Sequence, residues 1–247
     1  ISTIAALVAA GAGAVVAKHG NRSVSSKCGS ADVFKALGVN IEAPIETVER
    51  CLSEIGIAFL FAPLLHKAMK YAIGPRREIG IRTVFNILGP LTNPAGARNM
   101  LLGVFSEAMV EVLASVLRNL GAEHVYVVHG LDGLDEITTT TETAVAELQD
   151  GVIRTYRVQP EDFDLPRASL DDLTVEEPGQ SAAVIRSVLA GAPGPARDIV
   201  VLNAAAGIAA ADAAPDLQAA ATRAAEAIDS GAAQDALDKL VRISQGT

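Results

Sequence analysis

The sequence predicts an α/β protein with a mixed, mostly parallel sheet flanked by helices. A continuous apolar run at 57–61 is typical of a central strand that is buried on both faces, and the run HVYVVHG at 124–130 predicts a further strand. Residues 107–121, which precede the second run, carry apolar side chains at the spacing of one helical face. Strands that alternate with helices form a parallel or mixed sheet covered on both sides. At 247 residues, the chain is long enough for one large domain or two modest ones.

The first half of the chain predicts a compact succession of elements: a helix at 3–12, a strand at 14–18, helices at 30–38 and 44–56, and a strand at 57–61. Gly38 and Gly56 end the second and third helices, because glycine readily adopts the backbone conformation that closes a helix. A polar, basic helical stretch follows at 66–80, and it is broken by Gly74 and Pro75.

The second half alternates more clearly. It predicts a strand at 101–105, a helix at 107–121, a strand at 124–130, a hairpin over 143–160, and alanine-rich helices from residue 181 onward. Asp150 and Gly151 mark the turn of the hairpin, since this dipeptide suits tight turns between antiparallel strands. The loop at 131–136 directly follows the strand predicted at 124–130 and so lies at its carboxyl end, which is where ligands of such sheets bind.

Charge and cysteine content limit the possible functions. The net charge of −9 argues against general binding to nucleic-acid backbone. Residues 1–100, however, carry 11 Lys and Arg against 6 Asp and Glu, which indicates a local anionic ligand such as phosphate or carboxylate. We find no apolar window of membrane-spanning length and no secretory leader. Cys28 and Cys51 fit neither a disulfide framework nor a zinc signature, so we expect a cytosolic protein with reduced thiols.

The segment 18–30, KHGNRSVSSKCGS, concentrates hydrogen-bond donors at the end of a predicted buried strand. Its glycines let backbone amides approach an anion closely. The side chains that could bind phosphate are Lys18, Asn21, Ser25 and Ser26. His19 could act as an acid or base, or could have a structural role. We interpret Cys28 as a bystander thiol.

The loop LDGLDE contains two adjacent carboxylates, Asp135 and Glu136. Two like charges side by side are relieved by solvent or by a hard cation, and Mg²⁺ suits one or two carboxylates together with ligand phosphates. A solvated acidic loop is the alternative, and Asp132 could equally be solvated.

A third cluster, GPRREIGIRT, contains Arg76, Arg77 and Arg82. Arginine captures carboxylates through two parallel hydrogen bonds. These side chains could also be solvated cations at a helix end.

Three segments together resemble the anthranilate phosphoribosyltransferase family: KHGNRSVSSKCGSADVFKALG, RREIGIRTVFNILGPLTNPA and VVHGLDGLDEITTT. They occur in the order of the family, and the similarity runs over residues 1–247. The resemblance implies a nucleoside phosphorylase-like fold and transfer of the phosphoribosyl group of phosphoribosyl pyrophosphate to anthranilate, a step of tryptophan biosynthesis. It also implies Mg²⁺ as cofactor and a homodimer.

The resemblance also implies roles for particular residues. Those expected to bind phosphoribosyl pyrophosphate are Ser2, Thr3, Lys18, Asn21, Ser25, Ser26 and Ser30. Asp135, Glu136 and Ser2 are expected to bind the metal. Asn21 and Arg76 are expected to contact anthranilate, with His19 and Pro63 as walls of its pocket. No residue is assigned as a catalytic acid or base, because the amine nucleophile needs positioning more than activation.

The chain also departs from the family pattern. Family members carry an N-terminal helical segment and a glycine-rich GTGGD loop before an N-x-S-T stretch, whereas the sequence as given starts inside that stretch. Within residues 1–247, about 64–92 should contribute to a small helical domain whose N-terminal helices are absent. We therefore expect the polypeptide as given to be inactive or nearly so, with its dimerisation in doubt.

Two other functions compete with this interpretation. A pyrimidine nucleoside phosphorylase would share the architecture and handle ribose and phosphate, but its lysine and serine motifs differ from KHGN. A non-catalytic relative that binds nucleic acid is disfavoured because residues 101–247 carry 9 basic against 23 acidic side chains.

Overall fold

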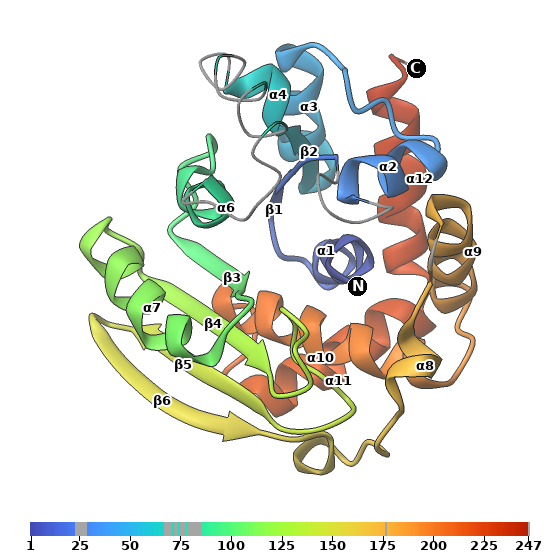
Figure 1. The fold of residues 1–247 in the computed structure, drawn as a ribbon. Helices are drawn as coiled ribbons and strands as arrows, with labels where there is room; N and C mark the ends of the chain where they lie inside the picture. The colour runs from blue at the N-terminus through green and yellow to red at the C-terminus, as the bar shows by residue number, and fades with distance from the viewer. Residues whose placement is uncertain are drawn as a thin grey trace.

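The computed structural model describes residues 1–22, 29–66, 71, 74, 78, 85–175 and 177–246. The strands of this part form one sheet of two strands and one of four, in the orders β1-β2 and β3-β4-β5-β6 (Figure 1). Their bounds are β1 Val16–Gly20, β2 Ile57–Phe61, β3 Asn99–Gly103, β4 His124–Gly130, β5 Thr143–Gln149 and β6 Val152–Val158. The strands predicted at 57–61 and 124–130 are confirmed at their predicted bounds, and those at 14–18 and 101–105 each lie two residues away.

The α/β class with mixed pairing is confirmed. β1 pairs with β2 and β3 with β4 in parallel, whereas β4 with β5 and β5 with β6 are antiparallel. Among the described strands, parallel pairs therefore do not predominate as the sequence analysis expected. Asp150 and Gly151 have φ of 52° and 76°, the left-handed backbone of a two-residue hairpin, which confirms the predicted turn between β5 and β6. The difference comes from the antiparallel pairing of this hairpin with β4.

The helices cover both sheets. Their bounds are α1 Ser2–Gly11, α2 Ser30–Ala36, α3 Ile45–Ile55, α4 Ala62–Leu65, α6 Phe85–Leu88, α7 Val110–Asn119, α8 Leu170–Leu173, α9 Pro178–Leu189, α10 Pro195–Ala210, α11 Leu217–Asp229 and α12 Ala232–Ser244. Short 3-10 helices lie at Pro90–Thr92, Glu107–Met109 and Pro160–Phe163. Gly38 and Gly56 follow α2 and α3 with φ of 98° and 74°, which confirms them as helix ends.

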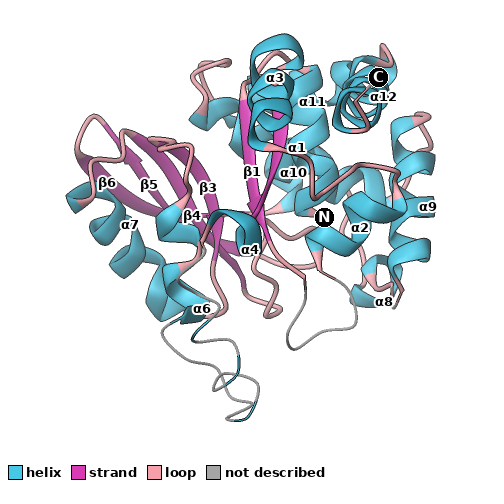
Figure 2. Cartoon of the chain, turned by 90° about the horizontal axis from the view of Figure 1, so that it is seen from above, coloured by secondary structure: helices cyan, strands magenta, loops and turns pink. Residues whose placement is uncertain are grey.

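β4 divides the core. Its side chains alternate, so Tyr126 and Val128 join the large core built around α1 and α10, while Val125 and Val127 pack with α7. Figure 2 shows α7 on one outer side of the molecule and α2, α9 and α12 on the other, with the strands between them. The four-stranded sheet that contains β4 is therefore covered on both faces, and its polar loops lie at the ends of the strands.

Two further expectations concern other parts of the chain. Cys51 is buried and forms no disulfide, whereas Cys28 lies outside the described residues. Most of the segment at 64–92, expected to belong to a small helical domain, also lies outside them, so that division stays a prediction. No helix in the described ranges is long and apolar enough to cross a membrane.

Candidate functional site

Three segments that are distant in the sequence meet at the carboxyl end of β4. The ammonium of Lys18 in β1 donates a hydrogen bond to Oγ of Ser2 at 3.2 Å. The backbone amide of Ser2, at the start of α1, donates to the carboxylate of Glu136. Asp135 and Glu136 both attract the charge of Lys18. Residues predicted separately for phosphate and for metal thus form one site.

The charges of this site influence one another. Burial lowers the pKa of Lys18, and the nearby carboxylates of Glu136 and Asp135 oppose that shift. Burial and the nearby charge of Asp135 raise the pKa of Glu136 to about 7, against the opposing effects of Lys18 and the amide of Ser2. Glu136 is therefore costly to ionise in its buried position, and a cation bound beside it would favour its charged form.

The donor set fits Mg²⁺. Two carboxylates and the Ser2 hydroxyl would offer oxygen atoms, the type of ligand that this hard cation prefers. Across the described ranges, no group of three or more His, Cys, Asp or Glu side chains could enclose a metal ion. Any Mg²⁺ at this pair would complete its coordination with water and with the oxygens of a phosphate ligand, which is its usual coordination in phosphate-transferring enzymes.

Asp132 differs from its two neighbours, because its role is to shape the loop. Its carboxylate accepts hydrogen bonds from the hydroxyls of Thr138, at 2.6 Å, and Thr140, and from the amide of Leu134 at 3.0 Å. Burial alone would raise the pKa of Asp132, but these hydrogen bonds outweigh burial and lower it. The run of threonines after the acidic pair thus folds the loop back onto itself.

A pair of histidines lies at the end of the parallel strands β1 and β2. Nε2 of His19 lies 3.1 Å from Nε2 of His66, and the two rings meet edge to face. Burial lowers the pKa of His19, the charges of His66 and Lys18 lower it further, and a hydrogen bond to the backbone of Gly89 opposes them. His19 is therefore held neutral, as a wall or a hydrogen-bonding group. Pro63 lies in α4, three residues before His66.

The other predicted ligands occupy less uniform positions. Ser30 begins α2 close to the end of β1, since a Cβ on Gly20 would lie 2.3 Å from the Ser30 hydroxyl. The exposed Asn21 follows β1 directly, and its carbonyl accepts the amide of Ala31. Thr3, by contrast, is 5% exposed and sits in the core side of α1. Ser25, Ser26, Arg76, Arg77 and Arg82 lie outside the described residues.

Comparison with known proteins agrees with this geometry. The family described as "Glycosyl transferase family, a/b domain" matches residues 1–234. Anthranilate phosphoribosyltransferase of Geotalea uraniireducens is 57% identical over 244 residues, which cover 99% of this chain and 70% of the relative. The enzyme of Moorella thermoacetica is 57% identical over 241 residues, covering 98% and 71%. The chain belongs to the anthranilate phosphoribosyltransferase family.

Solved structures of the family share the fold. The anthranilate phosphoribosyltransferase of Thermus thermophilus superimposes with a TM-score of 0.92 at 46% identity, over 99% of this chain and 73% of that one. The Saccharomyces cerevisiae enzyme, in complex with PRPP and Mg, gives a TM-score of 0.89 at 28% identity, over 100% and 69%.

Two residues next to the predicted site residues, His66 and Asn203, are not apparent from the sequence patterns. His66 follows the buried strand β2 by five residues, and the predicted pairing of parallel strands could have placed it beside His19. Asn203 in α10 hydrogen-bonds the backbone of Ile137, next to Glu136, and a buried asparagine within an alanine-rich helix was the available signal.

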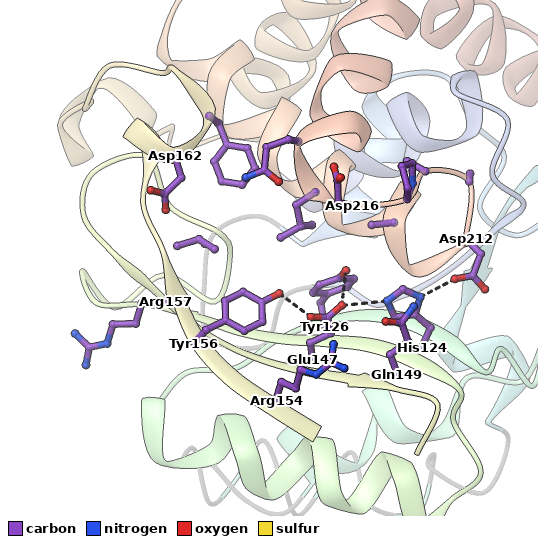
Figure 3. A pocket seen from close by; sticks show the side chains of 18 residues that line it. His124, Tyr126, Glu147, Gln149, Arg154, Tyr156, Arg157, Asp162, Asp212 and Asp216 are labelled. Atoms are coloured by element: carbon purple, nitrogen blue, oxygen red, sulfur yellow. Dashed lines mark hydrogen bonds and ion pairs between the residues drawn. The ribbon is translucent and has the colours of Figure 1, made fainter. Parts of the chain in front are cut away.

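A further cavity lies away from this site. A space of about 1030 Å³ opens between the strands β4, β5 and β6 and the turn after α10 (Figure 3). There Glu147 accepts the hydroxyls of Tyr126 and Tyr156 at 2.9 and 3.1 Å, and His124 lies between Glu147 and Asp212. This cluster is at the amino end of β4, about 20 Å along the strand from the acidic loop. It is separate from the residues that the sequence analysis singled out.

Proposed function

We propose that this chain transfers the phosphoribosyl group of phosphoribosyl pyrophosphate to the amine of anthranilate, giving N-(5-phosphoribosyl)anthranilate and pyrophosphate. The observation that carries the proposal is the meeting of Lys18 and Ser2 with the Asp135–Glu136 pair at a strand carboxyl end, in a chain of this family. Ammonium, hydroxyl and paired carboxylates together suit a metal-bound pyrophosphate ester.

We propose Mg²⁺ as the cofactor, held by Asp135, Glu136 and the hydroxyl of Ser2. When bound, Mg²⁺ supplies neutralisation of the charge that builds on the pyrophosphate leaving group. The Saccharomyces cerevisiae enzyme supports this proposal, because its solved structure is a complex with PRPP and Mg. Lys18, which bonds Ser2, is positioned to bind phosphate oxygens on the same side.

The remaining residues would act on the acceptor. As the bond to pyrophosphate lengthens, the ribose carbon gains positive character, and the neutral aromatic amine must lie in line with it. His19, kept uncharged by its surroundings, and Pro63 would form walls of the anthranilate pocket, with Asn21 and Arg76 as polar contacts. On the donor side, we propose four further ligands of phosphoribosyl pyrophosphate: Thr3, Ser25, Ser26 and Ser30. Orientation and electrostatic complementarity then supply most of the rate.

A direct assay tests the proposal. Purified protein in which this chain is preceded by the N-terminal segment of the family is mixed with anthranilate, phosphoribosyl pyrophosphate and Mg²⁺, and pyrophosphate release is recorded with and without anthranilate. We expect release that requires anthranilate and stops on addition of EDTA, whereas residues 1–247 by themselves should release little or none. Phosphorolysis of a pyrimidine nucleoside without anthranilate turnover would favour the phosphorylase alternative, and a salt-dependent gel shift would favour a nucleic-acid-binding relative.

A homodimer is proposed on the resemblance to the family. Light scattering coupled to size-exclusion chromatography measures the mass directly. A mass of one chain at all accessible concentrations would contradict it.

A further inference from the structure

We propose that Asn203 and Gly103 are positioning residues, which hold the backbone of the Asp135–Glu136 pair so that both carboxylates can bind one Mg²⁺. This inference rests on the proposed function of the pair. The two residues come from α10 and β3, and they act on the acidic loop at adjacent peptide groups.

Asn203 binds both backbone groups of the residue that follows Glu136. Its Oδ1 accepts the amide of Ile137 at 2.9 Å, and its Nδ2 donates to the carbonyl of Ile137 at 2.8 Å. The same Nδ2 also donates to the carbonyl of Ile199, one turn earlier in α10, at 2.8 Å. Because an amide side chain carries both a donor and an acceptor, Asn203 ties the loop to the helix at two points.

The surroundings of Asn203 make this connection rigid. The side chain is 1% exposed, and its neighbours in α10, such as Leu202, Ala204 and Ala206, are buried and apolar. A buried polar group costs free energy unless its hydrogen bonds are satisfied, so water cannot replace the contact with Ile137 without loss. Ile137 is itself 2% exposed and belongs to the same core.

Gly103 supports the other side of the pair. A Cβ built on Gly103, the last residue of β3, would lie 1.7 Å from the carbonyl oxygen of Asp135 and 2.6 Å from its carbonyl carbon. Any side chain at position 103 must therefore push the Asp135 peptide away from the strand. The obstacle is backbone, so a rotamer change cannot relieve it.

The two contacts together fix the backbone immediately before and after Glu136. Two adjacent carboxylates repel one another, and a free loop would let them separate into solvent. Mg²⁺ requires nearly octahedral geometry, so the position of each carboxylate matters. Outer partners that orient metal ligands typically contribute about 10–100-fold to metal affinity. We expect losses in that range when either contact is removed.

The test measures metal binding directly, with Mn²⁺ as the probe. Mn²⁺ is titrated into the protein in the presence of inorganic pyrophosphate, and free Mn²⁺ is read by electron paramagnetic resonance. For Asn203→Leu, Asn203→Asp and Gly103→Ala we expect Mn²⁺ to bind about 10–100-fold more weakly than in the unmodified protein. Asn203→Asp keeps the acceptor for the amide of Ile137 but sets an oxygen against the carbonyls of Ile137 and Ile199, so it tests the two donated hydrogen bonds separately.

Matched controls separate positioning from general stability. Ser244→Ala removes another buried polar side chain, which accepts the amide of Asn40 at 3.0 Å and donates to Val241. Gly179→Ala adds a methyl group to a glycine with open space around its Cβ. Both should leave Mn²⁺ affinity unchanged, even where Ser244→Ala lowers the melting temperature as much as the Asn203 variants do.

The possible outcomes are distinct. Folded Asn203 and Gly103 variants that bind Mn²⁺ as tightly as the unmodified protein would overturn the positioning role, as would weakening of equal size in Ser244→Ala. If Asn203→Leu fails to fold, Asn203→Asp and Gly103→Ala decide the question. In the protein that includes the N-terminal segment of the family, Mn²⁺ binding without anthranilate turnover would contradict the proposed function alone, whereas an unmodified protein that binds no Mn²⁺ would overturn both.

Discussion

The two ends of strand β4 carry acidic groups with opposite surroundings. At the amino end, Glu147 accepts hydroxyl groups from Tyr126 and Tyr156 and lies 3.5 Å from the ring of His124 (Figure 3). At the carboxyl end, Glu136 accepts the backbone amide of Ser2, and the ammonium of Lys18 attracts both carboxylates of the Asp135–Glu136 pair.

This difference distinguishes a carboxylate that stabilises the fold from carboxylates that are available to bind a cation. A carboxylate whose oxygens already accept hydrogen bonds from protein groups needs no external cation. Removing that carboxylate would leave the donating groups without a partner. Two adjacent carboxylates that repel one another are stabilised by a cation from solution. The presence of a cavity is a poor guide here, because a cavity of about 1030 Å³ adjoins the hydrogen-bonded cluster around Glu147.

The largest effect is expected from removing the charges of the acidic pair. Asp135→Asn combined with Glu136→Gln keeps the shape of both side chains but removes the ligands for Mg²⁺, so turnover should fall by about 10²–10³-fold. Steady-state rates measured across a Mg²⁺ titration provide the check.

Asp171→Asn combined with Asp172→Asn is the matched control, since it removes two adjacent charges from α8. That variant should keep the full rate. Turnover of the Asp135–Glu136 variant that recovers fully at saturating Mg²⁺ would show that the pair is not the metal site.

The hydrogen-bonded cluster around Glu147 should respond in stability instead. Glu147→Leu leaves the hydroxyls of Tyr126 and Tyr156 without their acceptor, which should lower the free energy of unfolding by about 2 kcal/mol. Urea denaturation measures this loss, and the Mg²⁺ dependence of turnover should stay as it was.

Glu142→Gln is the control for this variant. Glu142 is an exposed residue paired with Arg157 at 2.8 Å, and pairs of that kind contribute little to stability. If Glu147→Leu changed the Mg²⁺ affinity without changing stability, the stabilising role of Glu147 would be contradicted.

The smallest effect concerns histidines in the two regions. His124 lies between two carboxylates, whereas His19 lies beside His66 and Lys18, which lower its pKa after burial has done so. The pKa of His19 in the folded chain lies below the ordinary 6.5. As the pH falls, His19 is therefore protonated in the unfolded chain at a higher pH than in the folded chain. Its contribution to stability therefore falls as the pH drops below 6.5.

His19→Gln removes this pH-dependent contribution. Between pH 7.5 and pH 5, the variant should lose less unfolding free energy than the unmodified protein, as measured by denaturation at each pH. An identical or steeper loss in the variant would contradict the lowered pKa.

Much of the local structure could be predicted from the sequence. The apolar runs of β2 and β4, the glycines that end α2 and α3, and the Asp150–Gly151 turn of the hairpin all lie where they were expected. The acidic pair was also identified, because adjacent carboxylates after a strand are visible in the sequence. Each of these signals depends on residues within a few positions of one another.

Other features could not be predicted in this way. The hairpin over 143–160 is visible in the sequence, but its antiparallel pairing with β4, which extends the larger sheet, is not. The role of Asp132 beside the acidic pair is not visible either, although the threonines that bond it lie within eight residues.

By itself, the sequence determined the α/β class, the main strands and helices, and the two polar loops that hold the candidate ligands. Only the tertiary structure decided that Ser2, Lys18 and Glu136 meet, that His66 faces His19, and that Asn203 holds the peptide next to the acidic pair. Periodicity and turn chemistry act between near neighbours, whereas Asn203 and Ile137 are 66 positions apart. Such distant residues meet because strand order and the packing of α1 and α10 bring them together.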